Sequence, residues 1–568
     1  MMQRLFSWLR RPPTATPSDE RLDYPAWRRQ RLVDRANLYP APKPPIGFSI
    51  LTAVQNPPPP LLDALAQSIF QQEYPHFEWV IVDNGSNLTT QRRLTQLTRD
   101  PRVVLVPSPV NRGIVGGLRL ALRSARNEYI LPVDHDDELT PDALRVVAAS
   151  LAALGRPAVA YTDEDKLLPD GTPAHPFFKP DWDPLLFLNC CYTAHLGVMK
   201  REAALAVGAY TDEQAQGSPD WDAFSRLVAA GHRPRHIAEI VYSWRMHAGS
   251  TAQGGSAAKP YTLAGQYHVL QQHLDRTGLG RHLTIRANPL LGDVGWWRAT
   301  AGTRRRRRRD DLVILERAVH DDSFRLAVDY LPPGAIVAIQ ASEATPATAD
   351  WFQEPLALLD AFPEAVAVGG VLITRRGRLV AGPGVMGMDG LAGWPGRGGR
   401  RGDLLGAGTL VHQHRASLVD DRFFLVRGDF LKEMLTDAGP DFAISLLGPW
   451  VGATARRLGR TVLFTPYLVG QVRRSTLPEP SADETWRFLR NQWALLLDDP
   501  CYSRFLSLQG KSAWELASPA DRAAVLNRTL AQLAGVLPYF ELLKVDDRRY
   551  LHRAIALPEE NAGRSAAA

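Results

Sequence analysis

The chain has 568 residues, of which 45% are hydrophobic and 22% charged, and its formal net charge is +6. This composition excludes a disordered or fibrous protein, and the length allows at least two domains with substantial cores. Its three cysteines, Cys190, Cys191 and Cys501, exclude a disulfide framework and a cysteine-based zinc site.

The N-terminal segment is basic and carries no targeting signal that we recognise. No run approaches the roughly 18–20 apolar residues that span a bilayer, and a signal-peptide core is missing, so we expect a cytoplasmic protein. Residues 1–11 mix apolar side chains with arginines, which suits either weak peripheral contact with the membrane or a disordered leader. The basic runs lack a nucleic-acid module and are interpreted as solvated, so nucleic acid is not an expected partner.

Strands and helices alternate from residue 47 onward. Residues 47–54 indicate a buried strand, 61–72 have helical spacing, and 77–83 indicate a second strand. After an extended stretch at 102–106, a helical stripe over 114–125 leads to a third apolar run at 129–133. This repeated β-α-β pattern predicts an α/β fold whose ligands bind at the carboxyl ends of the strands.

A dense acidic cluster, Asp134, His135, Asp136 and Asp137, ends the apolar run at 129–133. Carboxylates at such a strand end can hold a divalent cation and, through it, a diphosphate. The alternative is an ordinary strand end that leads into a helix beginning near Asp142.

The order of these motifs resembles the family 2 glycosyltransferases of the GT-A fold. The matching segments are SILT (49–52), QQEYP (71–75), VDNGS (82–86), NRG (111–113) and DHDD (134–137). Three downstream segments resemble a bacterial cell-surface polysaccharide, or O-antigen, subgroup: 161–166, 178–182 and 217–222. The resemblance covers about residues 46–250 and implies a Rossmann-like nucleotide-diphospho-sugar transferase domain.

The resemblance also implies a donor site. Thr52, Asp83, Asn84 and Asp134 would contact the nucleotide, although Asn84 stands where the family commonly has a second Asp, which leaves the base open. Asp134 and Asp136 would form the D-x-D element that binds Mg²⁺ or Mn²⁺ and both phosphates.

Asp220, in GSPDWD (217–222), stands at the position of the family's catalytic base. The alternative is an acid-rich helix N-terminus favoured by the helix dipole. His247 would complete the metal shell and Arg245 would close over the diphosphate, both in a segment that the family shares.

Weaker predictions concern further polar residues. Asp137 and Asp165 are candidates for diphosphate or acceptor contacts. Asp163, Glu164 and Asp165 are placed in a loop that either lines the acceptor side or faces solvent. The roles of Lys179 and His195 are left open in the same way.

An arginine-rich break separates a second unit that lacks the chemistry of the first. We expect a basic leader (1–45), a catalytic GT-A domain (46–300), a linker (301–311), a smaller degenerate GT-A-like domain (312–480) and a helical C-terminal region (481–568). The D-x-D position of the second unit reads approximately Ala341-Ser342-Glu343, and 448–456 carries no carboxylate at the expected base position. We therefore expect the second unit to be catalytically silent and to serve as an acceptor platform or structural partner. The alternative is a differently built active domain.

The sequence thus predicts an inverting, metal-dependent glycosyltransferase of the hexosyltransferase type. It would move a sugar from a nucleoside-diphosphate sugar to a cell-surface glycan, such as lipopolysaccharide, or to a lipid-linked acceptor; inversion follows from the resemblance alone. One alternative is a non-catalytic carbohydrate-binding or scaffold protein of polysaccharide biosynthesis. Another is a nucleotidyltransferase, which the loop at 55–60 disfavours because it has no glycine, lysine or arginine.

Overall fold

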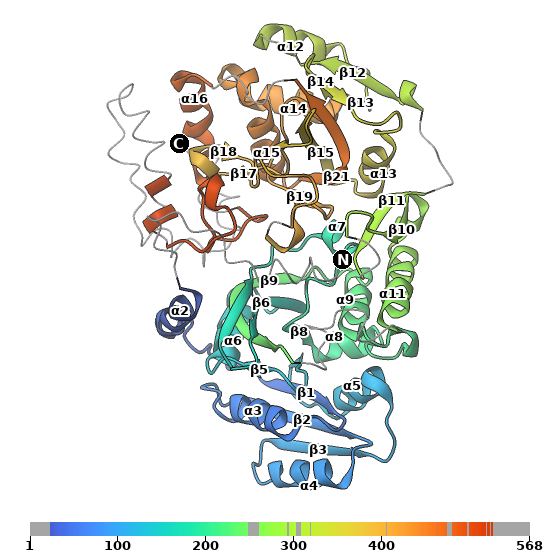
Figure 1. Cartoon of the computed structure of the whole chain (residues 1–568), viewed down its shortest axis with the longest axis vertical. Coiled ribbons are helices and arrows are strands. Elements are labelled where there is room, and N and C mark those ends of the chain that lie inside the picture. Colours follow the sequence, from blue (N-terminus) through green and yellow to red (C-terminus); the bar gives the residue numbers. More distant parts are fainter. Residues whose placement is uncertain are drawn as a thin grey trace.

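The computed structural model describes residues 23–247, 261–291, 295–302, 308–317, 320–404, 406–473, 480–496, 499–518, 520–522 and 524–525. Two twisted sheets, each packed with helices, form the two halves of the molecule (Figure 1). The predicted α/β class is confirmed. Every helix in this part of the chain is too short or too polar to cross a membrane.

The first half contains a nine-stranded sheet and a two-stranded hairpin. Its strands are β1 (Phe48–Val54), β2 (Phe77–Asn84), β3 (Val103–Ser108), β4 (Tyr129–Pro132), β5 (Glu138–Leu139), β6 (Val159–Leu167), β7 (Pro173–Phe177), β8 (Gly197–Lys200), β9 (Arg235–Arg245), β10 (Leu283–Ala287) and β11 (Trp297–Ala301). Its helices are α2 (Tyr24–Leu38), α3 (Pro59–Phe70), α4 (Leu88–Leu97), α5 (Gly113–Ser124), α6 (Ala143–Ala153), α7 (Pro184–Phe187), α8 (Arg201–Ala206), α9 (Pro219–Ala229) and α11 (Tyr261–Thr277).

The strand order of this sheet is β3-β2-β1-β4-β8-β6-β9-β5, with β7 beside β6. Strands β1, β2, β3 and β4 are parallel, and β6 runs parallel to β9. Every residue of β1 is buried, as expected of a parallel strand covered on both faces. The carboxyl ends of β1, β4, β6 and β9 therefore meet at one edge of the sheet, where the acidic cluster lies.

Helix α2 packs against the first sheet although we placed its residues in a basic leader. Arg31 is 7% exposed and binds Glu239, with 3.1 Å between Nε and Oε2. Arg28 binds Asp165 at 2.6 Å. The interpretation of these arginines as solvated is wrong, because both pair with carboxylates of the sheet. No local signal in the sequence indicates this pairing, since the carboxylates lie more than 130 residues away along the chain.

The second half contains an eight-stranded sheet. Its strands are β12 (Leu312–Glu316), β13 (Ile336–Gln340), β14 (Ala344–Pro346), β15 (Ala365–Thr374), β16 (Leu379–Ala381), β19 (His414–Ala416), β20 (Phe423–Arg427) and β21 (Thr461–Val472), beside a small β17 (Val385–Met386) and β18 (Ala392–Gly393) pair. Its helices are α12 (Asp321–Asp329), α13 (Gln353–Ala361), α14 (Gly428–Ala438), α15 (Leu447–Arg457) and α16 (Ala482–Gln492). Residues 499–518, which we expected to be helical, consist mainly of turns and isolated β-bridges, with one short 3₁₀ helix (Gly510–Ser512).

The second sheet repeats the later part of the first. Its order β12-β13-β20-β15-β21-β14 corresponds to β1-β4-β8-β6-β9-β5, and each pair has the same direction in both sheets. Within the described ranges, nothing corresponds to β2 and β3. Helix α15 precedes β21 as α9 precedes β9, so the two halves are related in topology.

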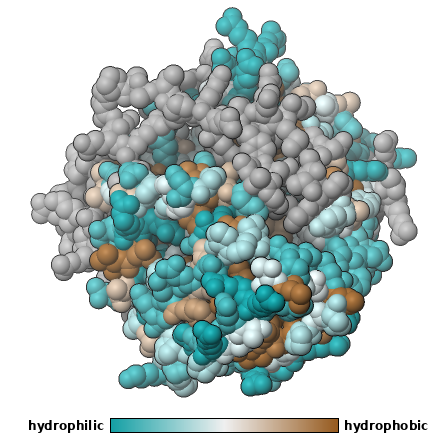
Figure 2. All heavy atoms as spheres, turned by 60° about the horizontal axis from the view of Figure 1, so that its bottom comes forward, coloured by the Kyte–Doolittle hydropathy of each residue, from teal (hydrophilic) through white to brown (hydrophobic). Residues whose placement is uncertain are grey.

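The surface of the first half, brought forward in Figure 2, is mainly hydrophilic, with hydrophobic side chains in small separate groups. Leu88 and Val110 are among the large apolar side chains that stay exposed. Isolated apolar side chains of this kind are ordinary on a protein surface.

Candidate active site

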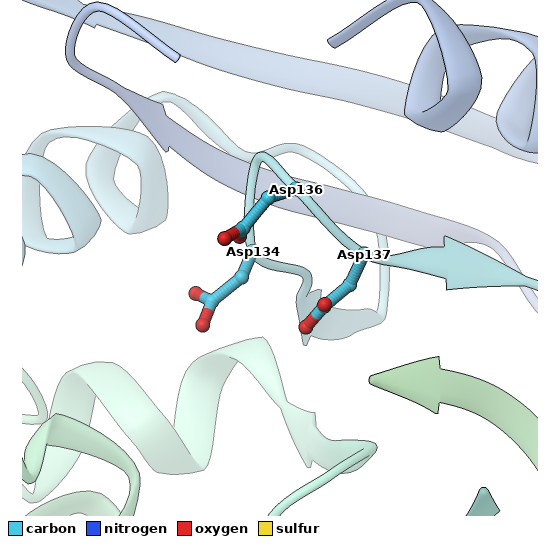
Figure 3. Close-up of side chains that lie close together, drawn as sticks. All are labelled: Asp134, Asp136 and Asp137. Carbon is cyan, nitrogen blue, oxygen red and sulfur yellow. The ribbon is translucent and has the colours of Figure 1, made fainter. Parts of the chain in front are cut away.

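The acidic cluster lies in the loop between β4 and β5. Oxygens of Asp134, Asp136 and Asp137 all lie within 4.8 Å of one another. Figure 3 shows the three side chains projecting from this loop toward the same side. Three carboxylates at this spacing form the kind of oxygen ligand set that Mg²⁺ and Mn²⁺ prefer.

Asp137 is the buried member of the cluster and is held by β9. Its carboxylate accepts hydrogen bonds from the Tyr242 hydroxyl at 2.5 Å and from the Arg245 backbone N–H at 2.8 Å. Burial, together with the charges of Asp136 and Asp134, raises the pKa of Asp137 well above its usual range. The burial of this side chain supports a role in fixing the loop rather than the weakly predicted ligand contact.

Asp136 is partly exposed and contacts His247. The Nε2 atom of His247 lies 2.7 Å from Oδ2 of Asp136, which brings together two of the three residues predicted to bind metal. Burial alone would raise the pKa of Asp136, but His135 and His247 outweigh it and lower that pKa. Asp136 is therefore ionised near neutral pH, as a metal ligand must be.

Asp220 lies in the first turn of α9, which begins at Pro219. Its Oδ1 atom is buried and has no hydrogen-bond partner in the described part of the chain. Burial raises the pKa of Asp220 to about 6; His195 opposes this shift and Asp134 adds to it. A desolvated carboxylate with an unused oxygen and a pKa near neutrality can accept a proton from a ligand.

His195 is a site residue whose role the sequence left open. Its ring stacks on Tyr242 with 4.9 Å between ring centroids, and its backbone N–H donates to Glu164. Burial lowers the pKa of His195, but the Glu164 carboxylate, whose Oε2 atom lies 3.4 Å from Nδ1 of the ring, outweighs it and raises that pKa to about 9. The imidazole is thus a cation whose charge acts on Asp134, Asp137 and Asp220.

The acids at 163–165 form part of β6 and are buried, so the loop predicted for them and the solvent-facing alternative are both wrong. Asp163 accepts a hydrogen bond from His236 at 2.8 Å. The carboxylate of Glu164 lies 3.4 Å from Lys179 Nζ, and burial of Glu164 is outweighed by Lys179 and His195, which lower its pKa to about 2.

The carboxylate of Asp165 is bound by residues of α2 and β9. It accepts hydrogen bonds from the Tyr24 hydroxyl at 2.6 Å and from the Ser243 hydroxyl at 2.5 Å, and it pairs with Arg28. The side chain is fully buried. These contacts argue against the weakly predicted role in binding acceptor or diphosphate.

Asp83 and Asn84 end β2, where we predicted nucleotide contacts. Asp83 accepts a hydrogen bond from the Ser86 N–H at 3.0 Å and is 7% exposed. Asn84 donates to the Gly113 carbonyl at 2.9 Å and accepts from the Arg112 N–H at 2.9 Å. Its amide therefore holds the loop at 111–113, and a contact with the base stays a prediction.

Thr52 is fully buried, and its hydroxyl accepts the indole N–H of Trp79 at 3.0 Å. This burial argues against a direct nucleotide contact and supports a role in strand packing. Arg245 pairs with Glu138 through its guanidinium, while its backbone fixes Asp137, so its predicted contact with the diphosphate is untested.

In a comparison with known protein families, residues 49–204 match the family described as "Glycosyl transferase family 2". The chain is 34% identical over 247 residues to the uncharacterized protein y4gI of Sinorhizobium fredii, covering 43% of this chain and 27% of that protein. It is 30% identical over 287 residues to the O-antigen biosynthesis protein RfbC of Myxococcus xanthus, covering 48% of this chain and 22% of that protein. The chain thus spans about a quarter of the length of these relatives.

Among solved structures, residues 1–349 of S. aureus TarS are 16% identical to this chain. The superposition has a TM-score of 0.32 and covers 41% of this chain and 70% of that chain. The family match and the sheet order described above confirm the predicted GT-A fold for the first half.

Proposed function

We propose that this chain, whose residues 49–204 are a family 2 glycosyltransferase segment, transfers a sugar from a nucleoside-diphosphate sugar to a cell-surface glycan or lipid-linked acceptor. The observation that carries the proposal is the acidic loop at 134–137 lying within electrostatic reach of Asp220. A site for a charged donor and a site for a proton acceptor are thus combined at the carboxyl edge of one sheet.

Asp220 acts as the general base in this proposal. As the acceptor hydroxyl attacks the anomeric carbon, its proton moves to the Asp220 carboxylate and the bond between the sugar and the nucleoside diphosphate breaks. The free and desolvated Oδ1 of Asp220 supports this role, because it needs no partner to be displaced. Attack from the face opposite the leaving group would invert the anomeric centre, as the family resemblance implies.

The donor set of the acidic loop fits a divalent cation. Asp134 and Asp136 would hold Mg²⁺ or Mn²⁺, with His247 beside Asp136 and Asp137 fixing the loop from behind. When bound, such a cation would neutralise charge that develops on the diphosphate. His195 supplies a further positive charge from the protein itself, which limits repulsion between these carboxylates and Asp220.

The second half is proposed to be catalytically silent. In topology α15 corresponds to α9, and its first turn contains Gly448, Pro449 and Trp450, with no carboxylate at the position of Asp220. The loop after β13 offers Glu343 as its single acid at the position of the acidic loop. The repeated sheet therefore supports a structural or acceptor-holding role.

A thermal-shift panel with UDP, dTDP, GDP and CDP, with and without Mn²⁺, tests the proposal. One nucleotide should raise the apparent Tm in a Mn²⁺-dependent manner, because a ligand that binds only the folded state stabilises it. The shift should be lost in Asp136→Ala. If no nucleotide raises the Tm of the wild-type protein, the non-catalytic scaffold function is favoured instead.

Location in the cytoplasm and membrane contact through residues 1–11 stay predictions, and those residues lie outside the described ranges.

A further inference from the structure

A cavity of about 420 Å³ lies between the two halves of the molecule. Its walls come from the turn before β9, from the segment around Trp182, and from β19, α15 and the start of β21. The halves are bonded beside it, because the Arg415 N–H donates to Asp183 at 2.5 Å and the Asp181 N–H donates to the Pro500 carbonyl at 3.0 Å. These hydrogen bonds fix the two halves against each other, so the cavity is a defined part of their interface.

The cavity lies at the opposite edge of the first sheet from the acidic loop. Arg233 precedes β9, whereas Arg245 ends that strand beside Asp137. Strands β6 and β9 have 9 and 11 residues, so the two edges are roughly 30 Å apart at about 3.3 Å per residue. A ligand in the cavity would not compete for the proposed donor site.

Positive charge dominates the cavity wall. Arg233, Arg415, Arg456 and Arg460 line it, whereas the acidic lining residues are Glu364 and Asp499. Asp499 is buried and already accepts hydrogen bonds, including one from the Ser417 hydroxyl at 2.5 Å. Arg460 is neutralised outside the cavity by Glu433 at 2.7 Å.

Two of these arginines retain unused binding capacity. The Nε atom of Arg415 is buried without a hydrogen-bond partner among the described residues. Arg233 makes no hydrogen bond or ion pair within the same residues and is exposed. Burial, followed by repulsion from the charges of Arg415 and Arg235, lowers the pKa of Arg233, although Asp181 opposes this shift. An anion would relieve that repulsion.

The size of the cavity suits a small ligand, because a volume of about 420 Å³ falls within the range of small-molecule sites. Trp182 forms part of the wall, but it is 8% exposed and packs on Phe187 and Tyr192. It therefore bounds the cavity, and the polar contacts of a ligand are left to the arginines.

We infer that this cavity binds an anionic saccharide, in which a sugar ring carries a phosphate or a carboxylate. Arg233 and Arg415 would bind the oxyanion through charge-assisted hydrogen bonds. The choice of an anion rests on the arginines, whereas the choice of a saccharide rests on the proposed function. The bound sugar is not the donor, because the cavity lies at the opposite edge of the first sheet from the acidic loop.

Isothermal titration without divalent cations tests this inference, with glucose 1-phosphate, glucuronate, glucose and inorganic phosphate as probes. Glucose 1-phosphate or glucuronate should bind the wild-type protein, and neutral glucose should not. The two charged sugars separate a phosphate ligand from a carboxylate ligand. Arg233→Ala should weaken binding by about tenfold or more, since a charge-assisted hydrogen bond is lost. Because Arg233 has no partner among the described residues that would be left unpaired, this variant should fold normally.

Arg99→Ala, at an exposed arginine that does not line the cavity, is the matched control and should bind as the wild type does. Absence of binding, equal binding of glucose, or inorganic phosphate binding as tightly as the charged sugars would overturn the inference. So would an Arg233→Ala variant that binds normally. Asp220→Asn should keep this binding while losing transfer, so a protein that binds these sugars but transfers none would contradict the proposed function alone.

Discussion

The Nε2 atom of His247 lies 2.7 Å from Oδ2 of Asp136, so the segment after β9 reaches the acidic loop after β4. The same strand holds Asp137 from behind through Tyr242 and the Arg245 backbone. Strand β9 therefore supports both the position of the loop and its contact with a histidine. A cation bound by the acidic loop should therefore also stabilise the carboxyl end of β9.

Asp136→Ala should eliminate Mn²⁺ binding, because this substitution removes the ionised carboxylate that contacts His247. His247→Ala should weaken Mn²⁺ binding by about 10–100-fold, the range for loss of a supporting contact at a metal site. Mn²⁺ titration followed by electron paramagnetic resonance measures both effects. His268→Ala is the control, because His268 pairs with Asp212 at 2.9 Å away from the acidic loop. Equal binding by all three variants would contradict the assignment.

Asp220 and Asp222 offer a matched pair of substitutions in one helical turn. Asp220→Asn should lower kcat by about 10²–10⁴-fold, as expected for loss of a general base, without lowering Tm. Asp222 is buried and binds Arg226 at 2.6 Å and Arg276 at 3.1 Å. Asp222→Asn should therefore destabilise the fold by about 1–3 kcal/mol. Activity assays beside thermal unfolding separate the two outcomes, and a destabilised Asp220→Asn with normal kcat would reject the base role.

The pKa of Asp220, raised to about 6 chiefly by burial, sets a pH dependence. The base must be charged, so kcat/KM should rise with pH through about 6 and level off above it. Below that value the rate should fall by about tenfold per pH unit as the carboxylate is protonated. A pH profile of kcat/KM measures the inflection. The residual activity of Asp220→Asn should lack it, and a profile that is flat from pH 5 to 8 in the wild type would exclude this assignment.

Glu239 should make the stability of the protein depend on pH. Its burial is outweighed by Arg31, Arg504 and Arg35, which lower the pKa of Glu239 to about 2. A lowered pKa stabilises the fold above the unfolded value of about 4.5 and loses this effect as pH falls through about 2. Glu239→Gln should cost on the order of 3 kcal/mol at pH 7 and progressively less below pH 4.5.

Urea unfolding at pH 7 and pH 3 measures this difference. Glu128→Gln is the matched control, because Glu128 pairs with Arg156 at 2.8 Å near the surface, where a salt bridge contributes at most about 1 kcal/mol. A pH-independent effect of Glu239→Gln would show that the ion pairs are not its source.

Glu343 tests whether the second half takes part in the chemistry. It stands where the first half has its acidic loop, but no second carboxylate accompanies it there. Glu343→Ala should leave kcat and KM unchanged within about twofold, since surface substitutions away from a site have small effects. A transfer assay beside Asp136→Ala provides the comparison. Loss of activity in Glu343→Ala would indicate a catalytic second half.

The sequence predicted the elements whose signals are local. The apolar run of β4 followed by Asp134 and Asp136, and the acidic start of α9 at Asp220, were readable because strand ends and helix starts carry nearby signals. The structure brings these groups within electrostatic reach of one another, as the predicted α/β fold required.

Partners remote in sequence could not be predicted. Tyr24 reaches Asp165 across 141 positions, and Arg31 reaches Glu239 across 208, so neither the burial of these acids nor the packing of α2 has a local signal. The charge of His195 likewise depends on Glu164, which pairing between β6 and β8 brings beside it.

The shortened second sheet leaves one strand without an outer neighbour. The first sheet continues past β1 with β2 and β3, but in the described residues β12 pairs only with β13. An open edge of this kind is a template for pairing with another chain, and positive charge is a common means of preventing it. The exposed residues Arg308, Arg309, Asp310 and Asp311 come directly before β12. Charged side chains beside an open edge disfavour its pairing with another chain, so this short segment should oppose association of β12 with a second copy of the protein.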